Sequence, residues 1–247
     1  MLQLKEWIYK HKIILILAVI LTVLLSWNFI HSFSETVSDN SWDGVVATEF
    51  SSGNGTRDNP YVITSASEYG YFKELLEGSD ASLYLDKYYV ITDSFNYGNY
   101  SISINNILPF TGTLDGTGHS IYGATLNNSL FNELDGATIK NIKYSLNITS
   151  DKTSGILSNS INDTKLSYFI LDGSINGNNS DITVSGIGNT ISNSEIENIV
   201  INVDANSSNY VSISNNISST TINNVLVRTG YNHLSFDSEY EVDDTGF

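Results

Sequence analysis

The chain has 247 residues, which is enough for one good-sized domain or two small ones, and its formal net charge is −16. The 27 Asp and Glu residues against 11 Lys and Arg residues argue against a protein that binds the nucleic-acid backbone. The absence of cysteine excludes disulfide scaffolds and thiolate metal sites. Hydrophobic residues make up 40% of the chain, so a folded core is expected.

Residues 13–30 form an uncharged apolar run. As a helix it would span roughly 27 Å, near the lower limit for a bilayer core. Lysines precede the run and acidic residues follow it, so the positive-inside rule places residues 1–12 in the cytoplasm and the rest outside. We expect an uncleaved single-pass signal anchor in the cell membrane, followed by a polar linker over residues 31–41. The alternative is a cleaved signal peptide, which would make the protein secreted.

Residues 42–109 are expected to form an N-terminal cap region. Within it, Ser65 and Glu68 have the spacing of a capping box, and apolar residues then follow at helical spacing. This pattern predicts a short helix near residues 66–77. Residues 83–92 are rich in β-forming residues and predict a strand.

Four repeats follow, with the pattern Φ-x-N-x-Φ-x4-Φ-x2-Φ-x-Φ, where Φ is an apolar residue. They begin 27, 30 and 26 residues apart, and their length varies only in Asn, Ser and Gly-rich connectors. Fixed apolar columns with variable connectors are typical of a solenoid, and period-2 columns predict strands. We therefore predict an all-β parallel β-helix, with coils over residues 110–230 and a C-terminal tail or cap over residues 231–247. The repeats start at Leu130, Leu157, Ile187 and Ile213.

One asparagine occupies the same place in every repeat. Stacked asparagines can form a hydrogen-bonded ladder between coils, so we expect a structural role for them and not ligand binding. The column consists of Asn132, Asn159, Asn189 and Asn215. A second asparagine column is interrupted by one tyrosine and consists of Asn141, Tyr168, Asn198 and Asn224.

An outward position between the last two apolar columns carries apolar side chains in three successive coils. These residues are Ile170, Val200 and Leu226, and they would line up on the outside of one sheet. An exposed apolar row is either covered by another segment or meets a partner. We favour cover by the C-terminal tail, and a binding surface for a partner is the alternative.

Three blocks of sequence carry a resemblance to a known family. Residues 42–47 read WDGVVA, residues 53–63 read GNGTRDNPYVI, and residues 110–121 read FTGTLDGTGHSI. Over about residues 42–145 the chain resembles bacterial surface proteins with GLUG-type repeats. That resemblance implies a right-handed parallel β-helix exposed on a bacterial, Gram-positive cell. Members of that family are mostly adhesin-like, and the resemblance brings no shared catalytic residues with it.

Polysaccharide-cleaving enzymes also use β-helices, so a catalytic cluster has to be considered. A glycoside hydrolase needs two carboxylates, and a lyase needs acids beside a base. The best candidates are Asp172, Asp204 and Arg228, but acids at strand ends are usually solvated, so we predict no catalytic site. No metal site or cofactor is predicted either, and loose binding of extracellular calcium is a separate possibility.

The leading hypothesis is a non-enzymatic membrane-anchored surface protein that displays a small β-helix to bind a glycan or a surface-protein partner. One alternative is a polysaccharide lyase or glycoside hydrolase of the β-helix type. The other is a structural surface or assembly component.

Overall fold

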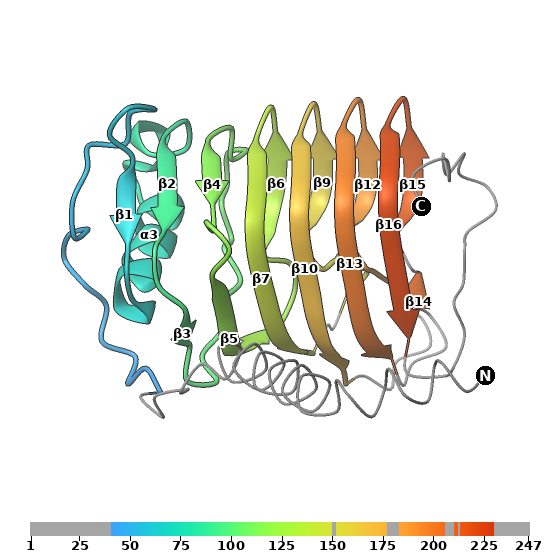
Figure 1. The fold of residues 1–247 in the computed structure, drawn as a ribbon, viewed down its shortest axis with the longest axis horizontal. Helices are drawn as coiled ribbons and strands as arrows, with labels where there is room; N and C mark the ends of the chain where they lie inside the picture. Colours follow the sequence, from blue (N-terminus) through green and yellow to red (C-terminus); the bar gives the residue numbers. More distant parts are fainter. Residues whose placement is uncertain (1–40, 150–151, 177–182, 206–209, 212, 230–247) are drawn as a thin grey trace, which may run out of the picture. The chain divides into compact units, whose positions relative to one another are not determined.

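The structure, a computed structural model, describes residues 41–149, 152–176, 183–205, 210–211 and 213–229 (Figure 1). The chain divides into two compact units, residues 1–40 and 41–247, and every described residue belongs to the second. The predicted membrane segment, residues 13–30, and the predicted tail, residues 231–247, lie outside the described residues. Among the residues that are described, no helix is long and apolar enough to cross a membrane.

The described part is a parallel β-solenoid, which confirms the predicted fold class. Its strands belong to three sheets, and Figure 1 shows successive coils stacked side by side. Sheet A has nine strands: β1 (Tyr61–Ile63), β2 (Tyr88–Ile91), β3 (Phe95–Asn96), β4 (Thr113–Asp115), β5 (Ser120–Leu126), β7 (Thr138–Ile148), β10 (Lys165–Ile175), β13 (Glu195–Ala205) and β16 (Thr221–Thr229). Sheet B contains β6 (Phe131–Asp135), β9 (Ser158–Asn162), β12 (Gly188–Ser192) and β15 (Ser214–Ser218). Sheet C contains β8 (Ser154–Gly155), β11 (Val184–Ser185) and β14 (Tyr210–Val211).

The register of the strands confirms the alignment of the four repeats. In sheet B, Leu134 pairs with Ile161, Ile161 with Ile191, and Ile191 with Ile217. In sheet A the last three apolar columns are likewise in register across β7, β10, β13 and β16. Nearly all of these side chains are buried in one continuous core. Each coil therefore buries its apolar residues only by stacking on its neighbours.

Two columns of residues with positive φ bend each of the four repeats at the same places. The first lies between sheets B and A, and the second lies inside the long strands of sheet A. The columns are Gly136, Asp163, Asn193 and Ser219, and then Asn141, Tyr168, Asn198 and Asn224, with φ between 45° and 71°. The second bend explains the two-residue gap in the repeat, because Ile139 and Ile142 are both buried although simple alternation would place them on opposite faces.

The sheet begins earlier in the chain than the predicted first coil at residue 110. Strand β2 pairs in parallel with β4, and β1 pairs in parallel with β2. The strand predicted over residues 83–92 is shorter than expected. Residues 81–83 form the 3-10 helix η1 (Ala81–Leu83), because the N–H of Leu83 donates to the Asp80 carbonyl and the N–H of Tyr84 donates to the Ala81 carbonyl.

The helix expected near residues 66–77 is α3 (Ala66–Glu77), and the Ser65 side chain caps it by accepting the N–H of Glu68 at 3.3 Å. Its buried face carries Tyr69, Phe72 and Leu76. The Phe72 ring packs on the ring of Tyr89 in strand β2, with centroids 4.6 Å apart. The helix therefore shares the core of the solenoid at the β1 end of the sheet (Figure 1). Its action as a cap against edge-to-edge aggregation stays a prediction.

A buried hydrogen bond joins helix α3 to the middle of the solenoid. The hydroxyl groups of Tyr69 and Tyr144 lie 3.1 Å apart, and both side chains are fully buried. Burial is the main cause that raises the pKa of both tyrosines. Both groups are therefore neutral at physiological pH, and each can donate to or accept from the other.

We expect Tyr69→Phe and Tyr144→Phe each to destabilise the protein by about 1 to 3 kcal/mol, because each leaves a buried hydroxyl without this partner. The double variant should lose less than the sum of the two single losses, with a coupling free energy of about 1 kcal/mol. Urea unfolding, monitored by circular dichroism, measures the free energy of unfolding of the parent chain, the two single variants and the double variant. Strictly additive losses would contradict the coupling.

Candidate functional site

The predicted apolar row lies on the outer face of sheet A, and its members are in register. Ile170 pairs with Val200, and Val200 with Leu226, on strands β10, β13 and β16. Ile170 is 38% exposed and Leu226 is 40% exposed, whereas Val200 is half-buried. In the preceding coil, Lys143 of strand β7 occupies the same position. The row therefore begins with a cation, and its apolar part is open to solvent within the described residues.

Tyr168 interrupts the second asparagine column at a position that is unfavourable for its side chain. Its φ is 51°, in the left-handed region that asparagine tolerates and bulky residues avoid. The side chain is also 59% exposed, so its burial in the core does not offset the strain. The other three coils have asparagine here, at Asn141, Asn198 and Asn224.

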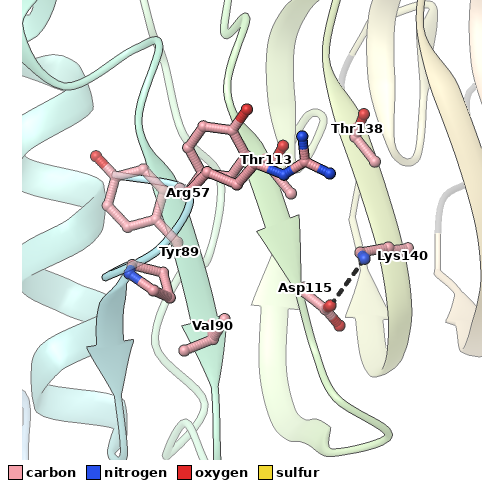
Figure 2. Close-up of a pocket in the computed structure, with 9 residues that line it drawn as sticks. Arg57, Tyr89, Val90, Thr113, Asp115, Thr138 and Lys140 are labelled. Carbon is pink, nitrogen blue, oxygen red and sulfur yellow. Dashed lines mark ion pairs between the residues drawn. The ribbon is translucent and has the colours of Figure 1, made fainter. Parts of the chain in front are cut away.

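Two cavities on the outer face of sheet A share the side chain of Asp115. The first, of about 410 Å³, is lined mainly by strands β2, β4 and β7, and Figure 2 shows its side chains. The second, of about 510 Å³, extends to strand β10. We call the two together the outer groove. Its principal lining residues are Arg57, Tyr88, Thr113, Asp115, Thr138 and Lys140 in the first cavity, and Thr117, Asn141, Lys143, Tyr168 and Ile170 in the second.

Asp115 is held by three donors at the junction of the two cavities. Its Oδ1 accepts the N–H of Thr117 at 2.9 Å and Nδ2 of Asn141 at 3.0 Å, and its Oδ2 lies 3.0 Å from Nζ of Lys140 (Figure 2). Partial burial alone would raise the pKa of Asp115, but these donors outweigh it and hold the pKa below its usual value. The ionised carboxylate thereby fixes the Lys140 ammonium in the groove.

The outer groove is cationic in an acidic protein. Three of the eight Lys and Arg side chains among the described residues line it, but only one of the seventeen Asp and Glu side chains does. Lys140 pairs with Asp115, and Lys143 pairs with Asp172 at 3.2 Å. Arg57 is exposed and forms no ion pair with the described residues, so its guanidinium is available to an anion.

The catalytic candidates lie on the same sheet but do not form a compact cluster. Asp172 and Arg228 are each in register with Asn202 between them, so two strand spacings, about 10 Å, separate them. The Asp172 carboxylate is engaged by Nδ2 of Asn202 at 2.6 Å and by Lys143. Asp204 is exposed and lies two residues beyond Asn202 on strand β13. Among the described residues, no group of three or more His, Asp or Glu could hold a metal ion.

The predicted asparagine column lies on the outer side of sheet B, and part of the expected ladder is present in it. Nδ2 of Asn159 donates to Oδ1 of Asn132 at 3.1 Å, and Nδ2 of Asn132 donates to the carbonyl of Asn106 at 3.2 Å. The column therefore extends one coil towards the N-terminus. Oδ1 of Asn189 is buried without a hydrogen-bond partner in the described part, and Asn215 is exposed at the far end of the column.

Sequence reasoning did not identify Arg57, Tyr88 or Lys140 as site residues. Arg57 comes from an irregular segment with no repeat pattern, so only the folded chain places it beside sheet A. Tyr168 did carry a usable signal, because an aromatic residue stands there in a column of asparagines.

We expect Tyr168→Asn to stabilise the protein by about 1 kcal/mol, because asparagine adopts the left-handed conformation at lower free-energy cost. Tyr168→Phe keeps both the ring and the strain, so it should leave the free energy of unfolding nearly unchanged. Urea denaturation of the two variants and the parent chain makes the comparison. An unchanged or lower free energy of unfolding for Tyr168→Asn would contradict the backbone strain assigned to Tyr168.

The lowered pKa of Asp115 predicts a pH-dependent contribution to stability. A depressed pKa means that the unfolded chain binds more protons, so this contribution is present at neutral pH. It should disappear as the pH falls below about 4 and through the folded pKa. Asp115→Asn should therefore be less stable than the parent chain at pH 7, and the difference should shrink in acid. A difference that stays constant between pH 7 and pH 3 in urea titrations would contradict the assignment.

Comparisons with known proteins give one partial similarity. No family model matches the chain, so its place among proteins with GLUG-type repeats stays a prediction. No solved structure matches it either. The chain is 29% identical over 174 residues to halomucin from Haloquadratum walsbyi, and the match covers 64% of the chain and 2% of halomucin. The similarity is therefore to a small part of a much longer protein.

Proposed function

We propose that this protein is a non-catalytic, membrane-anchored surface protein whose β-solenoid binds an extracellular partner through the outer groove. In this proposal residues 13–30 hold the chain in the cell membrane, and the solenoid lies outside. The resemblance to GLUG-type surface proteins supports display on a bacterial cell, and the similarity to halomucin is compatible with a surface protein.

The conformation of Tyr168 is the observation that carries the binding role. A left-handed conformation costs a residue of this kind roughly 1 to 2 kcal/mol, and the exposed ring regains little of it by burial. A strained residue that does not help the fold is a reason to look for a function. Tyr168 presents its ring beside Ile170 and Lys143 in the second cavity, where a ligand can use all three.

The chemistry of the outer groove favours an acidic glycan as the partner. Threonine hydroxyl groups and the Asn141 amide offer hydrogen bonds to sugar hydroxyls, and tyrosine rings offer flat apolar faces. The Arg57 guanidinium has the fork geometry that binds a carboxylate through two hydrogen bonds. A hydroxyl-rich polymer that carries anions satisfies all of these groups together.

The enzyme and structural alternatives make different demands on the same sheet. A lyase or hydrolase would use Asp172, Asp204 and Arg228, and it would generate new chain ends. An assembly component would use the apolar row of Ile170, Val200 and Leu226 to associate with another copy. Release of new chain ends would distinguish the enzyme from glycan binding, and self-association would distinguish the assembly component.

The full chain, kept in solution with a polyoxyethylene detergent, is incubated with immobilised acidic and neutral polysaccharides, with and without calcium. We expect retention on acidic polysaccharides that weakens as salt is raised, with no release of reducing or unsaturated ends. Arg57→Gln and Tyr168→Asn should each weaken retention severalfold. Lys73→Gln removes the same charge from a residue that lines neither cavity and should retain binding.

New chain ends that disappear in Asp172→Ala or Asp204→Ala would replace this proposal with the enzyme. Absence of retention on every polysaccharide would contradict a glycan ligand. Self-association of the chain, lost in Leu226→Asn, would then favour the assembly component.

A further inference from the structure

Four aromatic side chains surround a hollow beside helix α3, separate from the outer groove. The hollow has a volume of about 200 Å³ and opens to solvent. Its rings are Phe50, Tyr61, Tyr71 and Tyr84, all half-buried, and Glu49, Gly53 and Leu75 complete the lining. We call this feature the aromatic hollow. It has no part in the function proposed above.

The rings contact one another around the hollow and rest on a buried layer. The centroid of Phe50 lies 4.7 Å from that of Tyr61 and 5.1 Å from that of Tyr71, and Tyr61 and Tyr84 are 6.5 Å apart. Behind them, the ring of Tyr89 is fully buried and lies 5.8 Å from Phe50. The rings that line the hollow therefore pack against the buried Tyr89 on one side, and on the other side the hollow opens to solvent.

Local structure holds each part of the wall in place. Tyr71 and Leu75 are four residues apart on helix α3 and so share one face. The Tyr89 hydroxyl donates to the carbonyl of Tyr84 at 2.8 Å, which fixes the backbone behind the fourth ring. Gly53 turns the chain at the rim with φ of 96°, where a Cβ atom would lie 1.8 Å from the Pro60 carbonyl oxygen. These features fix the backbone that carries three sides of the hollow.

The surroundings of the hollow favour a positive charge. Its described lining contains the carboxylate of Glu49 and no Lys or Arg. Burial first, then the neighbouring phenols and the carboxylates of Glu49 and Glu74, raise the pKa of Tyr71. The negatively polarised faces of aromatic rings attract cations, as the carboxylate of Glu49 does.

We propose that the aromatic hollow binds an alkylated ammonium group, such as a trimethylammonium headgroup or a methylated lysine side chain. Aromatic faces bind such cations by cation–π attraction, and Glu49 at the rim adds a charge of opposite sign. A primary ammonium is bound strongly by water through its three N–H donors, so its transfer against aromatic rings costs more free energy. A quaternary nitrogen has no N–H group to desolvate, so aromatic side chains with one carboxylate at the rim suit it better.

Calorimetric titration of the full chain in polyoxyethylene detergent tests this assignment. The probes are choline, phosphocholine and a peptide with trimethylated lysine, which separate the two sources of the cation. The control ligand is the neutral tert-butyl isostere of choline, which has the same shape without the charge. We expect saturable binding of at least one cation and at least fivefold weaker binding of the isostere.

Two substitutions connect the binding to the aromatic hollow. Tyr71→Leu should weaken binding roughly threefold to tenfold, whereas Tyr71→Phe keeps the ring and should retain it. Glu49→Gln changes an exposed side chain, so folding is preserved, and binding should weaken roughly threefold with less dependence on salt. Glu133→Gln, which removes a carboxylate that does not line the hollow, is the matched control.

Equal binding of choline and its neutral isostere would overturn the proposal in favour of a simple apolar pocket. The same holds if no cation binds saturably, or if binding is indifferent to both Tyr71→Leu and Glu49→Gln. None of these outcomes bears on the outer groove, whose variants and ligands are different.

Discussion

Parallel, in-register stacking of the coils is the constraint on which the rest of this structure depends. Every hydrogen-bonded pair of the three sheets joins one coil to the next, and the strands of neighbouring coils lie about 4.8 Å apart. A side chain at a given place in one coil therefore sits directly over its equivalent in the next. Apolar residues become continuous columns inside the solenoid, and polar residues become rows outside it. Both the core and the candidate site are consequences of this repetition.

The two left-handed bends in each of the four repeats control which side chains face outward. Without the bend at Asn141 and its equivalents, the alternation of strand β7 would turn Ile142 away from the core. Asparagine suits this position because it tolerates positive φ and its amide can bond to the next coil, as Asn224 does to Asn198 at 3.1 Å. Tyr168 breaks this rule in the coil that borders the second cavity. The departure from the repeat thus coincides with the place where the outer surface is hollowed.

The two recessed surfaces differ in electrostatic character although they belong to one acidic chain. The outer groove gathers Arg57, Lys140 and Lys143, and it suits anions. The aromatic hollow gathers four aromatic side chains and the carboxylate of Glu49 without a Lys or Arg, which is the basis for the proposed cation. A net charge of −16 describes neither surface, because each is decided by the few side chains that the fold brings together. The Tyr69–Tyr144 hydrogen bond, in turn, ties helix α3, which forms part of the aromatic hollow, to the sheet that carries the outer groove.

The sequence by itself determined the solenoid, the register of its four repeats and the limits of helix α3. These features depend on local spacing and on residues that recur at fixed intervals, and both can be read along the chain. The outward row of Ile170, Val200 and Leu226 followed from the same periodicity. Only the tertiary structure decided that Arg57 lies beside strands β4 and β7, and that Phe50 and Tyr84 line one hollow with residues of helix α3. Those residues come from irregular segments without a repeat, so their positions depend on long-range packing that no local pattern encodes.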